Sequence, residues 1–352
     1  MKKIFEECTL GNLKLNNRLV RSATFENGGA TNGIINPILK PIYEDLAKGE
    51  VGLIITGMMS IGPNASANRS MVRICDNSFI AEFSKITQSV HELGGKIVVQ
   101  LGHCGAKSTV IDWGDKPFSP SIYGNAKEVT ESEIKMLVKK YGEAAIKCQK
   151  AGADGIQIHA AHGYLVSEFL SPYFNKRKDE YGGDIKGRTK FLLEIYDEIR
   201  TCVGDNYPIL IKINYCDLIE NGLVGTECEW VCSQLEKKGL NAIEVSSGIS
   251  VNSESAPTQP MQKKIEGFFA DGALKIAERV TIPVISVGGY RSLETIEKIL
   301  NQGKVSAVSL CRPFIREPSL AKRWHDGNRA KSSCVSCNGC FSTAQHGCIF
   351  NK

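Results

Sequence analysis

Eight short apolar runs recur along the chain, and a segment with helical spacing follows most of them. Most runs are continuously apolar and rich in β-branched residues, as in parallel strands that are covered on both faces. Strands are therefore expected at 18–22, 51–55, 96–100, 155–159, 209–213, 241–245, 283–287 and 307–310. Because strands and helices alternate without an internal repeat, the pattern predicts an α/β fold, the (β/α)8 TIM barrel.

The intervening segments carry helix signals. Residues 81–93 end at a Gly-Gly pair, and Thr130 with Glu133 forms a capping box that opens a helix to about residue 151. Further helices are expected at 187–203, 227–238 and 292–302. The alternative fold, a doubly wound open sheet, would need a G-x-G-x-x-G motif after the first strand, where the sequence has none. We expect a barrel domain at 1–328 and a cysteine-rich tail at 329–352.

Composition narrows the class of protein. A net charge of +5 over 352 residues is too small to indicate a nucleic-acid partner. No apolar run approaches the roughly 20 residues of a membrane span, and residues 1–7 lack the apolar segment of a signal peptide. A cytoplasmic protein without a nucleic-acid or membrane partner is expected, and a homo-oligomer is left open.

In a TIM barrel the chemistry lies at the carboxyl ends of the strands. Two imidazoles and a phenol, His159, His162 and Tyr164, follow the fourth strand within six residues. Such a group is suited to holding a polar oxygen and donating a proton to it. The alternative interpretation is that the histidines are buried structural hydrogen-bonding residues.

The loops after the last two strands indicate phosphate binding. Gly288 and Gly289 let backbone N–H groups approach an anion, and Arg312 can add a bidentate contact. Two tight turns with a surface arginine are the alternative. A phosphate there suits a sugar phosphate or flavin mononucleotide (FMN). A flavin would also use Gln100 as donor and acceptor, and Lys212 as the charge near N1. A buried Lys212 should have an anionic partner.

Several motifs together resemble the old yellow enzyme family of NADH:flavin oxidoreductases. The longest is H-A-A-H-G-Y-L at 159–165, followed by F-L-S-P-x-x-N-x-R-x-D-x-Y-G-G at 169–183. Shorter matches lie at 17–18, 21–24, 100–103 and 287–289, so that the resemblance covers about residues 4–325.

The resemblance implies a barrel that binds FMN and transfers a hydride from NADH or NADPH, through FMN, to the C=C bond of an unsaturated carbonyl substrate. It implies that His159 and His162 hold the carbonyl oxygen and that Tyr164 protonates the α-carbon. The implied FMN contacts are Ser22, Ala23, Thr24, Gly57, Gln100, Lys212, Gly288, Gly289, Cys311 and Arg312.

The chain departs from the family pattern at three positions. Many members have arginine at the place of Lys212 and glycine at the place of Cys311. Dienoyl-CoA reductases, whose barrel domain and cysteine tail this chain resembles, have a further active-site histidine where Asn252 stands. A neutral amide cannot act as an acid, which weakens that assignment. Substrate specificity is expected in the loops 105–127 and 249–263.

Four closely spaced cysteines follow the barrel: Cys334, Cys337, Cys340 and Cys348. Four thiolates in such a run suit an iron–sulfur cluster or a zinc site, and free thiols or a disulfide are the alternative. The run resembles the [4Fe–4S] loop of dienoyl-CoA reductases, with a tighter spacing. A cluster without a following flavin domain would need a separate electron-donor protein, or it would be structural.

The leading functional hypothesis is an FMN-dependent ene-reductase. The same fold also allows an amine or ether dehydrogenase or demethylase, and a non-catalytic FMN-binding redox sensor. A metal-dependent hydrolase using His159 and His162 as ligands is disfavoured, because no carboxylates are expected to converge on them.

Overall fold

The computed structural model describes residues 2–62, 64–112, 114, 116–250, 265–343 and 347–351. Eight parallel strands close into a barrel, because β11 pairs with both β8 and β12. Around the barrel the strands are β3 (Leu19–Arg21), β6 (Leu53–Ile55), β8 (Ile97–Gly102), β11 (Gly155–Ala160), β12 (Ile209–Asn214), β13 (Ala242–Ser246), β14 (Val284–Val287) and β15 (Ala307–Leu310). The predicted (β/α)8 barrel is confirmed, with each strand within two residues of its predicted ends.

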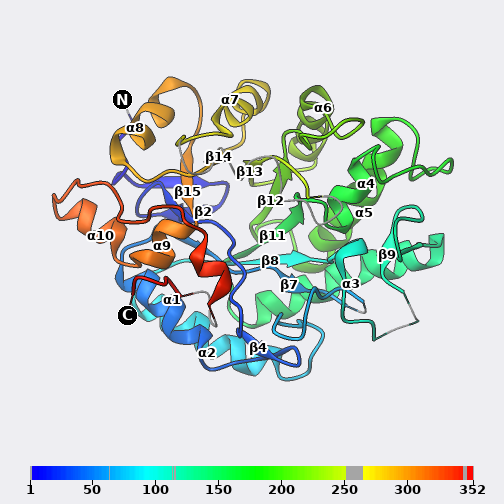
Figure 1. The fold of residues 1–352 in the computed structure, drawn as a ribbon, viewed down its shortest axis with the longest axis horizontal. Coiled ribbons are helices and arrows are strands. Elements are labelled where there is room, and N and C mark those ends of the chain that lie inside the picture. Colours follow the sequence, from blue (N-terminus) through cyan, green and yellow to red (C-terminus); the bar gives the residue numbers. More distant parts are fainter. Residues whose placement is uncertain are drawn as a thin grey trace.

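Helices surround the barrel, with α6, α7 and α8 along one side and α1 and α2 along another (Figure 1). The longer helices are α1 (Leu39–Lys48), α2 (Phe79–Glu92), α3 (Glu131–Lys150), α5 (Ile185–Val203), α6 (Gly225–Lys237), α7 (Ala270–Arg279) and α8 (Leu293–Gln302). Shorter helices are α4 (Leu165–Leu170), α9 (Arg312–Arg316) and α10 (Leu320–His325). The predicted capping box at Thr130 is present. The sequence analysis missed α1, whose Pro41 lies in the first turn, where a missing N–H is tolerated.

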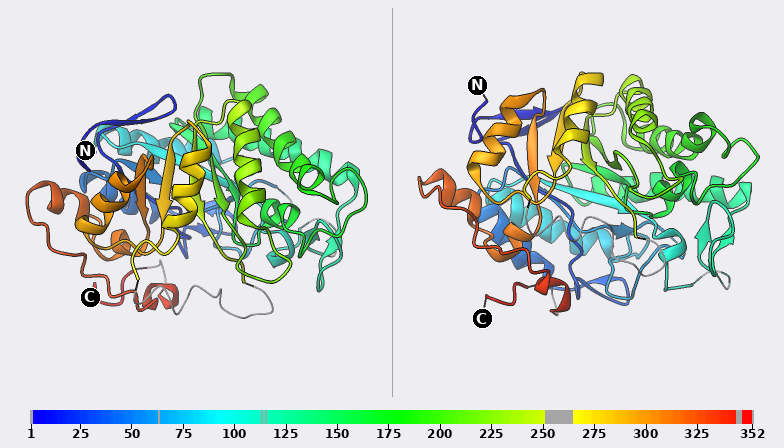
Figure 2. Two further views of the ribbon diagram at one scale, coloured as in Figure 1. Left: turned by 90° about the horizontal axis from the view of Figure 1, so that it is seen from above. Right: turned by 45° about the horizontal axis from the view of Figure 1, so that its top comes forward.

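A hairpin of β1 (Cys8–Leu10) and β2 (Leu13–Leu15) closes the amino-terminal end of the barrel. Its Leu10 and Leu15 pack in one apolar cluster with Val20, Leu210 and Ile285 from the strands. Figure 2 shows this hairpin and the red carboxyl-terminal segment at opposite edges of the molecule. The opposite end of the barrel is thus the one available for a site.

Short strands and turns fill the connecting loops. They are β4 (Ala30–Thr31), β5 (Ile34–Ile35), β7 (Met59–Ser60), β9 (Phe118–Ser119), β10 (Lys127–Glu128) and the 3-10 turns Gly105–Lys107 and Gly339–Ser342. Asn252 and most of the predicted specificity loop 249–263 lie outside the described residues. Among the helices that the structure describes, none is long and apolar enough to cross a membrane.

The tail after α10 runs back along α9 (Figure 2). The Asn351 amide donates to the Arg316 carbonyl at 3.0 Å, and the Arg316 guanidinium donates to the Asn351 side chain. Ser332 and Ser333 donate to the Glu317 carboxylate at 2.9 and 2.8 Å. These polar contacts hold the tail against the end of the barrel where the strands finish.

Candidate active site

A cleft lies at the carboxyl ends of β3, β12, β14 and β15. It encloses about 800 Å³ of empty space, counted together with the solvent at its mouth. Eight of the predicted cofactor and catalytic residues line it: Ser22, Ala23, His162, Lys212, Gly288, Gly289, Cys311 and Arg312. Phe268, Phe269 and Phe341 add aromatic walls. The structure thus brings strand ends that are far apart in the sequence to one cleft.

A layer of polar side chains lies inside the barrel at this end, and we call it the polar floor. Its members are Ser22, Gln100, Gln157, Lys212, Glu244 and Ser309. The Lys212 ammonium donates to the Ser22 hydroxyl at 2.7 Å and lies 3.2 Å from a Glu244 oxygen. The anionic partner predicted for Lys212 is therefore Glu244, which the sequence analysis missed.

The rest of the polar floor converges on the same carboxylate. The hydroxyls of Ser22 and Ser309 each donate to Glu244 Oε1 at 2.7 Å, and the Gln157 amide donates to Oε2 at 2.9 Å. Gln100 in turn donates to the Gln157 side-chain oxygen at 2.7 Å. Three predicted FMN ligands, Ser22, Gln100 and Lys212, are thus joined through two residues that were not predicted.

Strand register explains these pairs. Gln100 stands opposite Gln157 in the β8–β11 ladder, and Lys212 stands opposite Glu244 in the β12–β13 ladder. Residues that are opposite each other on one face of neighbouring strands are in contact distance. One polar residue in an otherwise apolar strand was the available signal for Gln157 and Glu244.

The His159, His162 and Tyr164 rings come together beside the cleft. The ring centroids of His159 and His162 are 5.5 Å apart, and those of His159 and Tyr164 are 5.0 Å apart. His162 Nε2 lies 2.7 Å from the Ser246 hydroxyl, and its backbone is left-handed, with φ of 62°. The Ala161 amide donates to His159 Nδ1 at 3.3 Å, which leaves Nε2 as the N–H of a neutral ring.

The electrostatics of this cluster keep the rings uncharged. Burial, together with the Lys212 and Lys107 charges, lowers the pKa of His162 to about 3. Burial and the neighbouring His162 lower the pKa of His159 as well. Burial raises the pKa of Tyr164 above its ordinary value. At neutral pH the cluster therefore consists of two neutral imidazoles and a protonated phenol, all able to donate hydrogen bonds.

Lys107 and Glu168 border the cluster, and neither was predicted. The Lys107 ammonium donates to the His162 carbonyl at 2.7 Å and lies 5.3 Å from the centre of the Tyr164 ring. Glu168 is fully buried, and its Oε1 accepts from the Ala106 amide at 2.9 Å. Burial raises the pKa of Glu168 to about 8. Lys107 thus fixes the left-handed turn that carries His162.

The glycine turn after β14 packs too closely against Phe268 and Phe269 to carry a side chain. Gly288 and Gly289 have φ of 148° and 72°, and a Cβ on Gly289 would lie 2.5 Å from the Phe268 ring. Across the cleft, Arg312 donates to the Asn338 side chain of the tail at 2.6 Å. A guanidinium has five N–H groups, so this contact leaves others for an anion.

The three remaining predicted FMN residues, Thr24, Gly57 and Gln100, lie outside the lining of this cleft. Gln100 lies in the polar floor, and the Gly57 amide donates to the buried Glu26 carboxylate at 3.2 Å. Thr24 lines an adjacent pocket, and its hydroxyl lies 3.1 Å from the Cys311 sulfur at the cleft wall. Their roles as FMN ligands stay predictions.

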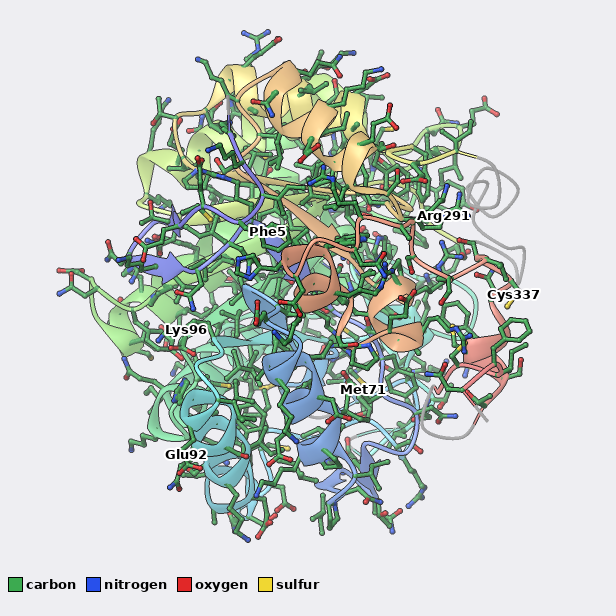
Figure 3. The ribbon with its side chains drawn as sticks, turned by 90° about the vertical axis from the view of Figure 1, so that its left-hand side faces the viewer. Phe5, Met71, Glu92, Lys96, Arg291 and Cys337 are labelled. Carbon is green, nitrogen blue, oxygen red and sulfur yellow. The ribbon has the colours of Figure 1, made fainter. Side chains whose placement is uncertain are left out.

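The four tail cysteines line one small cavity of about 300 Å³, together with Arg312 and Arg316. Cys337 lies at the periphery of the molecule (Figure 3). Burial raises the pKa of Cys340 to about 11. Among the residues that the structure describes, no three ligand-type side chains are gathered closely enough to hold a metal ion. The four cysteines that are closely spaced in the sequence thus also lie around one cavity in the structure.

Two curated relatives match nearly all of the chain. It is 34% identical to the NADH oxidase of Thermoanaerobacter brockii over 349 residues, covering 96% of this chain and 53% of that protein. It is 31% identical to the NADPH dehydrogenase of Bacillus subtilis, covering 91% of this chain and 94% of that protein. The chain thus spans about half the length of some curated relatives, such as the NADH oxidase.

Solved structures share the fold at lower identity. A 2-naphthoyl-CoA reductase complex superposes with a TM-score of 0.88 at 24% identity, over 99% of this chain and 56% of that one. Morphinone reductase with tetrahydroNAD gives 0.80 at 24%, over 93% and 92% of the two chains.

The family described as NADH:flavin oxidoreductase / NADH oxidase matches residues 3–331. That range includes every barrel strand and each predicted catalytic and FMN-binding residue. The relationship inferred from the strand-four motif is therefore confirmed: the chain belongs to the NADH:flavin oxidoreductase / NADH oxidase family.

Proposed function

We propose that this protein is an FMN-dependent NAD(P)H oxidoreductase of the ene-reductase type, which reduces the C=C bond of small unsaturated carbonyl compounds. The observation that carries the proposal is the grouping of His159, His162 and Tyr164 beside a cleft that contains a cation and a glycine turn. The barrel at 1–328 would hold this site, and the tail at 329–352 would be a separate cofactor segment.

The donor set of the cleft fits FMN. Gly288 and Gly289 form a cradle from which a Cβ is excluded, as a phosphate or ribityl chain requires. Arg312 and Lys212 supply donors, Ser22 lines the cleft beside Lys212, and Gln100 supplies a side-chain amide in the floor behind them. Ala23, Thr24, Gly57 and Cys311 complete the proposed contacts. When bound, FMN supplies hydride transfer from the nicotinamide to the substrate.

The protein's own residues bind, polarise and protonate the substrate. The N–H groups of His159 and His162 would donate to the carbonyl oxygen and stabilise the negative charge that develops there. Because both imidazoles are neutral at pH 7, they polarise the carbonyl without delivering a full charge. Tyr164, held protonated, would donate its proton to the α-carbon.

The proposal is tested with protein purified without air. We expect a yellow protein whose flavin absorbance is bleached by NADH or NADPH and restored by 2-cyclohexen-1-one. His159→Ala should weaken binding of a phenol by at least about tenfold, the cost of one lost hydrogen bond. The matched control is His91→Ala, an exposed histidine paired with Asp154 far from the cleft, which should leave phenol binding unchanged.

Two results would overturn the proposal. Colourless protein that does not bind added FMN would show that FMN is not the cofactor. Bleaching of oxidised flavin by an amine, with no turnover of any enone, would show that the protein is an amine dehydrogenase and not an ene-reductase. N,N-dimethylglycine is the probe for this second result, since a relative 29% identical to this chain is an N,N-dimethylglycine/sarcosine dehydrogenase.

We also propose that the tail binds a [4Fe–4S] cluster through Cys334, Cys337, Cys340 and Cys348, served by an electron-donor protein. The support is the shared cavity and the two arginines beside it, which would offset the charge of four thiolates. Iron and sulfide analysis of anaerobic protein tests it. Four iron atoms per chain are expected, whereas one zinc atom and no iron would overturn the cluster.

A further inference from the structure

Glu244 is an acidic residue in a place where a strand residue of a barrel core is ordinarily apolar. Its side chain has no exposed surface, and Lys212, its partner, is 5% exposed. Burial alone would raise the pKa of Glu244, but the Lys212 charge and the hydroxyls of Ser22 and Ser309 hold it below its ordinary value. The floor therefore carries an ionised carboxylate next to the ammonium that lines the cleft.

The hydrogen bonds around Glu244 are complete enough to fix its position. Oε1 accepts from Ser22 and Ser309 at 2.7 Å each and lies 3.2 Å from the Lys212 ammonium. Oε2 accepts from Gln157 at 2.9 Å. A carboxylate with four donors cannot be moved without leaving buried polar groups unpaired, which is costly.

Lys212 therefore does not present a whole positive charge to the cleft. At a separation of 3.2 Å the carboxylate and ammonium form a nearly neutral pair inside the protein. A cation beside a flavin favours the reduced form, since negative charge collects on the pyrimidine edge on reduction. A cation whose charge is offset by a neighbouring carboxylate favours the reduced flavin less.

We propose that Glu244 is a positioning residue that offsets the charge of Lys212 and thereby sets the preference of the cleft for oxidised over reduced FMN. The proposal rests on FMN binding as proposed above. It gives Ser309, which lines the cleft, and Glu244 and Gln157, which lie behind its lining, a role in the redox poise of the site.

The experiment measures the midpoint potential of FMN bound to the full chain, without air, against a reference dye. Glu244→Gln keeps the shape and removes the charge. We expect its affinity ratio for reduced over oxidised FMN to rise about tenfold, which is about 30 mV for a two-electron couple. In a Lys212→Met background the same change should alter the ratio less than twofold, because an unpaired buried Glu244 becomes protonated.

Ser309→Ala is the second variant, and it keeps the test decisive if Glu244→Gln does not fold. Removing one donor leaves more of the carboxylate's negative charge to offset Lys212, so the ratio should fall about threefold, in the opposite direction. An unchanged ratio in both variants would overturn the role of Glu244, as would an equal shift with and without Lys212. Failure of the wild-type protein to bind FMN would instead overturn the proposed function, so the two failures are distinguishable.

Discussion

The polar floor and the cysteine tail are two candidate redox elements that are built in opposite ways. The floor joins side chains from five strands with Ser22, which directly follows β3, and its contact between Ser22 and Glu244 spans 222 residues of sequence. The tail cysteines all fall within residues 334–348. In the floor each charge has a partner at hydrogen-bond distance, whereas the tail thiols share a cavity without a formed ligand set.

The positions of the two sets of side chains are determined in different ways. The register of the barrel fixes the floor, so its residues are positioned without any cofactor. The tail has a local spacing but little packing of its own, with Val335, Phe341 and Phe350 exposed. Its position comes from contacts of the residues around the cysteines, such as Ser333 with Glu317 and Asn338 with Arg312.

The largest effect is expected at the barrel end. Tyr164→Phe removes the proposed proton donor and should slow enone reduction by about 10²–10⁴-fold, the usual contribution of general acid catalysis. Stopped-flow reoxidation of the reduced flavin by 2-cyclohexen-1-one measures it. Tyr173→Phe, a tyrosine that packs on Tyr123 away from the cluster, is the matched control and should change the rate less than about twofold.

The tail should respond independently of the barrel. Replacing Cys334 and Cys340 together by serine should lower bound iron at least about tenfold, because half of the thiolate ligands are lost. FMN content should stay within about twofold of the wild type, with Cys75→Ser, an exposed cysteine outside the tail, as the control. Loss of FMN in the double variant would show that the contact between Arg312 and Asn338 makes the tail part of the flavin site.

Glu168 differs from the paired charges of the polar floor, because it is a buried carboxyl group whose pKa is raised. Because its pKa is raised to about 8, the folded protein keeps a proton that the unfolded chain loses above its ordinary value near 4.5. Stability should therefore fall with rising pH between about 5 and 8, by up to about 1.4 kcal/mol per pH unit. Urea unfolding of Glu168→Gln should show a weaker slope, whereas the exposed Glu278→Gln should follow the wild type.

The smallest effect is expected from protonation of the histidine pair. Burial lowers the pKa of His162 to about 3 and lowers the pKa of His159 well below its ordinary value, so both rings are expected to stay neutral at mildly acidic pH. The dissociation constant of cyclohexanone, a neutral ketone, should change less than about twofold between about pH 5.5 and about pH 8. A rise of tenfold as the pH falls to 5.5 would show that one imidazole titrates in this range.

The barrel was predictable because its signal is periodic. Apolar runs of similar length mark every strand, and the strand-end rule selected residues that the fold then brings together, among them Ser22, Lys212 and Gly288. The His159–Tyr164 group was visible because its members are close in the sequence. Local spacing and periodicity are the two patterns that can be read directly from a single sequence.

The partners of these residues were not predictable in the same way. Glu244 meets Lys212 only because β12 and β13 are neighbours in one register, and register cannot be read from either strand alone. Lys107 reaches the His162 carbonyl across 55 residues, from a loop without a motif of its own. The missed residues are thus those whose role depends on a contact between distant elements.

The register of the floor has a consequence for how the barrel folds. Shifting one strand by a single residue would turn Gln157, Lys212 or Glu244 outward, against the apolar helix layer. An unpaired charge buried there would cost several kcal/mol, far more than an apolar mismatch. The side chains of the polar floor therefore also favour the correct strand register. A barrel with one strand shifted would be less stable, because it would bury an unpaired charge.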